Sequence, residues 1–153
     1  MASAPDRGVV TSWFLDTLNT TYLAGDIEAP AGAGWQEEMN DVGAKFVPYL
    51  TIFPQPSQRA TGSLGDPSMD WMLPYSMNIY GVNRRQVEDL ADDVRADLLQ
   101  IKKVPLTMRD GVVWKMTTME CRTIGGVGYT TAVTPTAFSQ TDSYTMTLSR
   151  SLA

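Results

Sequence analysis

The chain has 153 residues, of which 12 are basic and 17 acidic, and its formal charge is −5. It has no histidine and one cysteine, which excludes a serine–histidine–carboxylate triad, a cysteine–histidine pair, a zinc site with histidine or paired-cysteine ligands and an intrachain disulfide. With 43% hydrophobic residues this length predicts one folded domain over residues 1–153, and the negative charge argues against electrostatic capture of nucleic acid or anionic lipid.

The N-terminal segment predicts a helix. Ser3 is the expected N-cap, Pro5 suits the first turn, and Gly25 is the expected C-terminal stop. One buried face is indicated by apolar and threonine side chains at helical spacing, namely Val9, Val10, Trp13, Phe14, Thr17, Leu18 and Tyr22. The first eight residues lack the basic region and long apolar core of a signal peptide, and no run approaches the roughly 20 apolar residues of a membrane helix. We therefore expect no membrane contact.

Residues 26–45 have no periodic pattern and predict a long loop. The stretch 29–34 (APAGAG) is small and flexible, and Trp35 follows it directly. Loops this long in small domains are usually functional or mobile. Trp35 either plugs the core of its own domain or docks on a neighbouring chain, and the sequence leaves both readings open.

The middle of the chain predicts two strands and a helix. A strand is expected over residues 46–53, with Pro48 placing it at an edge or a bulge, and a second over residues 71–82 after a loop. Asn83 is the expected cap of the helix that follows, with Gln86 as its capping-box partner. The buried stripe of this helix consists of Val87, Leu90, Ala91, Val94, Leu98 and Ile101.

The last third predicts β-structure. A turn is expected at Asp110-Gly111, followed by a strand that starts near Val112 and ends by Ile124, a long loop over residues 125–140 and a final strand over residues 144–149. Cys121 falls in the first of these strands. We interpret it as structural, although a reactive thiol beside Arg122 stays open. The predicted class is α+β, with a mixed, mostly antiparallel sheet flanked by two helices and joined by long loops.

Catalytic candidates are few. Glu37, Glu38 and Asp41 form one carboxylate group, and a second consists of Asp89, Asp92 and Asp93 on the polar face of the second helix. Either group has ligand atoms suited to magnesium, but a solvated helix face explains the second group as well. The run 125–128 (GGVG) lacks both the lysine and the following helix of a phosphate-binding loop. We expect no enzyme activity, no cofactor and no metal.

Aromatic side chains in or beside the long loops instead indicate protein–protein contact. The candidate assembly residues are Trp35, Arg59, Leu64, Trp71, Arg109 and Phe138.

Residues 46–100 resemble the tail terminator proteins of long-tailed phages, most closely those of actinobacterial siphophages. The resemblance rests on the segment 47–56 (VPYLTIFPQP), the loop 62–66 (GSLGD), the strand 75–82 (YSMNIYGV) and the helix start 83–95 (NRRQVEDLADDVR). The resemblance implies a mixed sheet flanked by two helices, and a hexameric ring in the virion neck. Such a ring caps the tail tube, stops its polymerisation and joins the neck protein above, while DNA passes through its lumen without specific binding.

Assembly of such a ring would take place in the host cytoplasm. Six copies at −5 each carry a formal charge of −30, which repels DNA. Three alternatives stay open at this point: a head-closure or adaptor protein of the same neck, a magnesium-dependent hydrolase that uses Asp89, Asp92 and Asp93, and a small binding domain with no virion role.

Overall fold

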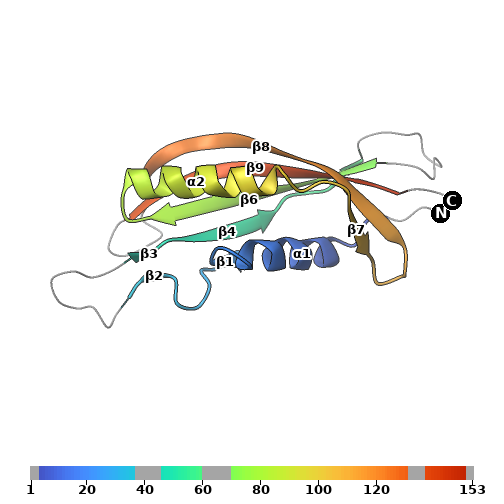
Figure 1. The fold of residues 1–153 in the computed structure, drawn as a ribbon, viewed down its shortest axis with the longest axis horizontal. Coiled ribbons are helices and arrows are strands. Elements are labelled where there is room, and N and C mark those ends of the chain that lie inside the picture. The colour runs from blue at the N-terminus through green and yellow to red at the C-terminus, as the bar shows by residue number, and fades with distance from the viewer. Residues whose placement is uncertain (1–3, 37–45, 60–69, 131–136, 151–153) are drawn as a thin grey trace.

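In the computed structural model, two helices lie against one face of a mixed, mostly antiparallel sheet (Figure 1). The structure describes residues 4–36, 46–59, 70–130 and 137–150. Their elements in chain order are α1 (Arg7–Asn19), β1 (Ala24–Asp26), β2 (Gly34–Trp35), β3 (Phe46–Val47), β4 (Tyr49–Pro54), β5 (Gln58–Arg59), β6 (Asp70–Gly81), α2 (Arg84–Leu98), β7 (Val104–Thr107), β8 (Val113–Thr130) and β9 (Ala137–Ser149). The predicted α+β class is confirmed.

The strands of the main sheet follow the order β1-β4-β6-β9-β8-β7, and β5 pairs with the start of β6. All of its pairings are antiparallel except that between β1 and β4. The long strands β6 and β9 pair along their whole length, from Asp70 opposite Ser149 to Gly81 opposite Phe138. β6 and β9 are therefore the two central strands, with the other strands of the main sheet on either side of them.

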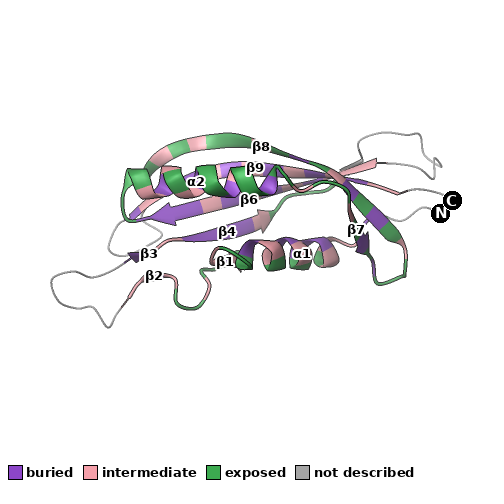
Figure 2. Cartoon of the chain, viewed as in Figure 1, coloured by how far each residue is buried: buried purple, intermediate pink, exposed green. Residues whose placement is uncertain are grey.

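Both helices cover the same face of this sheet. Asp142 and Tyr144 are two residues apart on β9, so their side chains point to one face. Asp142 lies 3.4 Å from Arg95 of α2, and the ring of Tyr144 lies 6.4 Å from that of Phe14 of α1. The main core therefore lies between this face and the two helices, where alternate residues of β6 and β9 are buried (Figure 2).

The first helix begins later and ends earlier than its sequence predicts. Asp6 is the N-cap: its carboxylate accepts a hydrogen bond of 3.1 Å from the amide of Gly8. The predicted cap, Ser3, lies outside the described residues. The helix ends at Asn19, so Gly25 as its stop is wrong: this glycine lies in β1, where a Cβ would meet the carbonyl oxygen of Glu28. The close approach explains the glycine without a helix cap.

The second helix matches its prediction closely. Asn83 is the N-cap, and its side chain accepts a 2.8 Å hydrogen bond from the amide of Gln86. The side chain of Gln86 reaches back one residue further than a capping box requires and accepts from the amide of Val82 at 2.7 Å. Four residues of the predicted stripe are fully covered, namely Val87, Ala91, Val94 and Leu98. None of the described helices is long and apolar enough to cross a bilayer.

Loss of this cap should be measurable. We expect Asn83→Ala to lower the free energy of unfolding by about 1 kcal/mol, because the amide of Gln86 loses its acceptor. Asn83→Ser retains an acceptor oxygen and should stay within about 0.5 kcal/mol of the parent protein. Urea denaturation followed by circular dichroism measures both, and equal losses in the two variants would contradict the capping role.

The prediction of a loop over residues 125–140 is wrong for its described part. β8 continues through the glycines to Thr130, with Gly125 opposite Thr141 and Gly128 opposite Ser139, and β9 begins at Ala137. Shifts in the pairing register occur between Thr123 and Gly125 and again before Gly128. Glycine in a strand permits such irregularities, so these residues bend the strand without ending it.

Candidate functional site

Those predicted assembly residues that the structure describes are divided between two ends of the sheet. Trp71 and Gly81 are ten residue steps apart on β6, which at about 3.3 Å per step separates them by roughly 33 Å. Trp71 pairs with Arg59 at one end, whereas Phe138 pairs with Gly81 at the other. Together the predicted residues do not form a single site.

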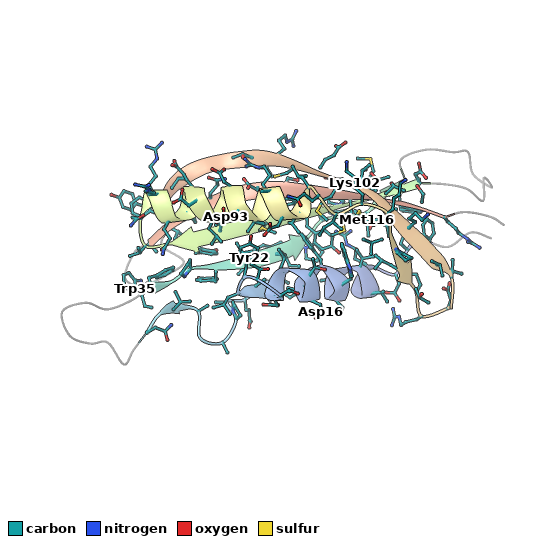
Figure 3. All side chains as sticks on the ribbon, viewed as in Figure 1. Asp16, Tyr22, Trp35, Asp93, Lys102 and Met116 are labelled. Atoms are coloured by element: carbon teal, nitrogen blue, oxygen red, sulfur yellow. The ribbon has the colours of Figure 1, made fainter. Side chains whose placement is uncertain are left out.

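Trp35 packs against its own domain. Its ring meets that of Phe46 edge-on at 5.2 Å, and both belong to a second, aromatic core cluster with Tyr49, Tyr80 and Ala137. Tyr49 and Tyr80 are stacked at 4.6 Å, and burial, followed by the influence of Tyr80, raises the pKa of Tyr49 to about 12. Figure 3 shows Trp35 at one end of the molecule, far from Met116. Of the two interpretations of Trp35, the structure supports the one in which its ring packs against the core of its own domain.

Phe138 and Trp71 are both half-buried. Phe138 contacts the ring of Tyr129 on the neighbouring strand at 4.6 Å, and Tyr129 is 79% exposed. Trp71 packs against the main core. Sequence reasoning missed Tyr129, the most exposed of the large hydrophobic residues among those described, although it lies in the same predicted loop as Phe138.

Arg109 binds the N-cap of the first helix. Its guanidinium forms an ion pair with Asp6, and this hydrogen bond holds the pKa of the Asp6 carboxyl below its ordinary value. The contact ties the turn between β7 and β8 to the start of α1. The backbone of Arg59 belongs to β5, and Leu64 lies outside the described residues.

The ion pair of Asp6 predicts a pH-dependent contribution to stability. A carboxyl whose pKa is lowered on folding stabilises the protein above its unfolded pKa of about 3.9, and this contribution is lost as the pH falls through the folded pKa. Asp6→Asn retains a capping oxygen but removes the charge. We expect it to lower the urea midpoint at pH 7 and to leave it unchanged near pH 2. An equal loss at both values would contradict the electrostatic account.

The acidic residues of α2 lie on its outer surface. Asp89 pairs with Arg85 at 3.8 Å and Asp92 with Arg95 at 3.6 Å, and both carboxylates are largely exposed. Within the described ranges, no group of three or more carboxylate or cysteine side chains is placed to hold a metal ion. Glu37, Glu38 and Asp41 lie outside those ranges.

A buried ion pair links this helix to the sheet. Asp142 is fully buried, and its carboxylate lies 3.4 Å from Arg95 and accepts a 2.9 Å hydrogen bond from Gln140. Arg95 also donates to the hydroxyl of Thr123 on β8 at 3.0 Å. One arginine therefore holds α2 to both β8 and β9, a role that its sequence position on a polar helix face does not indicate.

The second face of the sheet carries no helix in the part of the chain that the structure describes, and its centre is polar. Alternate residues of β6 and β9 point to this face, among them Ser76, Asn78, Thr141, Ser143, Thr145 and Thr147. All of these are only half-buried, although their strands are central in the sheet. Thr141 donates a 2.8 Å hydrogen bond to Asn78 across the strands. We call this the hydroxyl face; at one of its ends the aromatic cluster of Tyr49, Tyr80 and Ala137 covers it.

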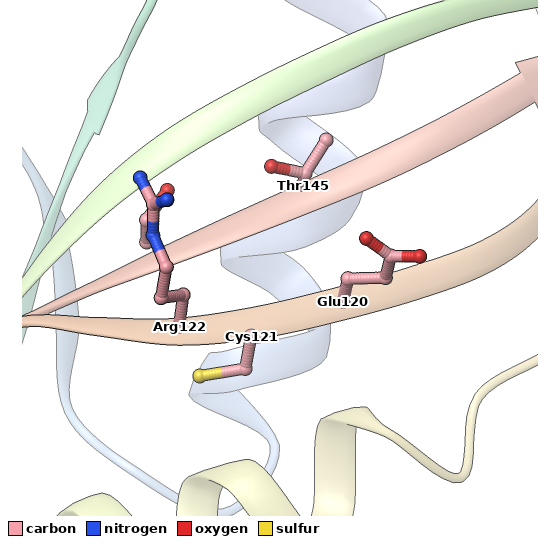
Figure 4. A pocket seen from close by; sticks show the side chains of 5 residues that line it. Glu120, Cys121, Arg122 and Thr145 are labelled. Carbon is pink, nitrogen blue, oxygen red and sulfur yellow. The ribbon is translucent and has the colours of Figure 1, made fainter.

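A shallow hollow lies where the hydroxyl face meets β8. Its volume is about 250 Å³, and it is lined by Glu120, Cys121, Arg122, Ser143 and Thr145. Glu120 and Arg122 stand on one side of β8, and the sulfur of Cys121 points to the other side (Figure 4). Neither charged side chain forms an ion pair within the described part of the chain.

No protein-family model and no curated protein matches the chain. Among the solved structures that match, one aligns with 97% of this chain and with 97% of its own length, at 10% sequence identity and a TM-score of 0.46. A likeness this distant carries no argument about function, so any proposal rests on the residues themselves.

Proposed function

We propose that this chain is a structural subunit of a phage virion, a tail terminator that forms a ring at the head-proximal end of the tail. The observation that carries the proposal is the hydroxyl face. No described helix covers the second face of this sheet, and the aromatic cluster covers only one end of it. At its centre the side chains of β6 and β9 are polar and uncharged, and Glu120 and Arg122 of β8 add one charge of each sign beside them. Together with the sequence resemblance to tail terminators, this favours a wall that faces water inside an assembly.

A wall with few basic residues suits the passage of DNA. Proteins retain DNA mainly through lysine and arginine contacts to phosphates. On the hydroxyl face, the positions of β6 from Met72 to Asn78 and of β9 from Ser139 to Ser149 include no basic residue, and Arg122 of β8 stands beside Glu120. In the proposed ring this face lines the lumen, and the net charge of −5 per chain adds repulsion to the small number of basic groups.

The proposed ring has six copies and two different neighbours, the tail tube protein below and a head-closure protein of the neck above. Each contact between copies is head-to-tail, because a ring requires a heterologous interface that closes after a fixed rotation. Stopping the tube requires that only one side of the ring match a tube ring. No catalysis, cofactor or membrane contact enters this role.

The mass and symmetry of rings formed with tail tube protein test the proposal. We expect the rings that form in such mixtures to contain six copies of the 16.8 kDa chain by light scattering behind size exclusion, and negative-stain images to show sixfold rings with an open centre. Substituting Ser143 and Thr145 by lysine adds charge to the hydroxyl face. The lysine rings should retain duplex DNA at low salt, whereas the parent rings should not. Particles without rotational symmetry, or lysine rings that bind no DNA, would contradict the proposal.

A further inference from the structure

The outer edge of β8 is unpaired over most of its length. β7 pairs with β8 only from Val113 to Met116, and in the described part of the chain no other strand follows on that side (Figure 1). An open edge presents amide and carbonyl groups that can pair with another strand, and proteins commonly protect such edges with charges or bulges. The stretch from Thr118 to Thr123 is regular, because the register shifts of β8 lie before and after it. It is therefore a usable template for strand pairing.

This stretch carries one charge of each sign. Glu120 and Arg122 are exposed and occupy alternate positions, so both point to the hydroxyl face (Figure 4). Thr118 and Ile124 flank them on the same strand and are also exposed. A single charge on this edge would repel the same charge on the edge of a second copy. With a glutamate and an arginine on each edge, opposite charges of the two copies can face each other instead.

The order of these residues is self-complementary in one register. When two copies of an antiparallel edge meet about a two-fold axis, each residue opposes the residue equally far beyond the axis. With the axis at Cys121, Glu120 of each copy opposes Arg122 of the other, and Met119 opposes Thr123. The nearest registers that keep each residue on its own face place the axis at Glu120 or at Arg122, and thus oppose two like charges.

We infer that the β8 edge binds the β8 edge of a second copy of this chain, antiparallel, over Met119–Thr123, with the two-fold axis at Cys121. The sheet then continues from one chain into the other, with two ion pairs across the junction. β7 limits the contact beyond Met116, and the register shift after Thr123 bends the rest of the strand away from the partner. The contact is short, so the pair is a reversible dimer.

This inference goes beyond the proposed ring and does not depend on it. A two-fold contact uses the same surface on both chains and closes at two copies, so it cannot by itself build a ring of six. The dimer is thus a form of the free chain, and the ring is a form of the assembled virion. Evidence against the dimer would leave the proposed ring unaffected, and evidence against the ring would leave the dimer unaffected.

Charge reversal and charge exchange test the register. In sedimentation equilibrium on the full chain, we expect a monomer–dimer equilibrium whose dissociation constant rises about tenfold or more in Glu120→Arg, because arginine then opposes arginine twice. The double variant Glu120→Arg with Arg122→Glu restores both ion pairs and should return to the parent value. Glu28→Arg, an equal charge change at another exposed position, should have no effect.

Crosslinking through Cys121, the single cysteine, tests whether the two-fold axis of the dimer lies at that residue. Two residues directly opposite in an antiparallel pair have Cα atoms about 4.5–5.5 Å apart, which a disulfide can span. Mild oxidation with diamide should therefore link the parent chain and the exchanged double variant into a covalent dimer, but Glu120→Arg far more slowly and Cys121→Ser not at all. A chain that stays monomeric at high concentration, a dimer indifferent to Glu120→Arg, or a dimer that cannot be linked through Cys121 would each overturn the inference. A sixfold ring without this dimer would overturn it while leaving the proposed function intact.

Discussion

Replacing Arg95 by methionine should lower the free energy of unfolding by about 3 kcal/mol. The substitution leaves the fully buried carboxylate of Asp142 with only the 2.9 Å hydrogen bond from Gln140. Removing one partner of a buried ion pair typically costs 3–5 kcal/mol, because the remaining charge stays desolvated and unpaired. Arg95 is itself 34% exposed, so water can reach its end of the pair, which places the expected loss at the lower end of that range. Urea denaturation measures it.

Two further variants separate this pair from the other contacts of Arg95. Asp142→Asn in the Arg95→Met background removes the unpaired charge and should recover about half of the loss or more. Asp92→Asn removes only the exposed partner of Arg95, 74% exposed, and should change stability by less than 0.5 kcal/mol. If Asp92→Asn were as costly as Arg95→Met, the buried pair would not be what joins α2 to the sheet.

Phe14→Ala should destabilise the protein by about 3–5 kcal/mol, the largest loss that we expect from one substitution in α1. Its ring is fully buried and meets Tyr75 edge-on at 5.1 Å and Tyr144 at 6.4 Å. Because the ring connects α1 to the two central strands, its removal leaves a cavity that the helix cannot fill without moving. Thermal and urea unfolding should both show the loss.

Variants with smaller changes keep this prediction informative even where Phe14→Ala does not fold. Phe14→Leu retains most of the buried volume and should cost clearly less than the alanine. Ser12→Ala, on the exposed side of the same helix, should stay within about 0.5 kcal/mol of the parent protein. Equal losses at positions 12 and 14 would indicate that α1 is held by its helix propensity and not by its contact with the sheet.

The sequence allows α2 and the central strands to be predicted because their signals are local. The α2 stripe and its Asn83 cap each depend on residues within one or two turns, and the structure confirms both. The alternation of Tyr75, Met77 and Ile79 likewise follows from the burial of one face. By contrast, the extension of β8 through Gly125 and Gly128 depends on pairing with β9, a partner more than ten residues away along the chain. A prediction from neighbouring residues alone therefore places a loop at these glycines.

Much less of the candidate site could be predicted. Aromatic residues near loops indicated an interface, but Trp35 packs on its own domain through Phe46, a contact that only the three-dimensional fold creates. The alternation of threonines with apolar residues in the segment 144–149 predicts one polar side of the last strand. It gives no indication that both helices cover the opposite face of the sheet. The inferred pairing of Glu120 with Arg122 of a second copy requires knowing that the outer edge of β8 is unpaired among the described strands. These properties arise from topology, which composition and spacing do not fix.

We propose that this chain forms a sixfold ring above the tail tube, with its hydroxyl face toward the lumen. An asymmetric cryo-EM reconstruction of the virion neck would test the position, the symmetry and the orientation of this ring together. We expect six copies of this fold in one ring between the last tube ring and the head-closure protein, with β6 and β9 exposing Ser76, Ser143 and Thr145 to the channel. Density for this fold at any other position, in a ring of another symmetry, or with its helices toward the channel would show that the proposal is wrong.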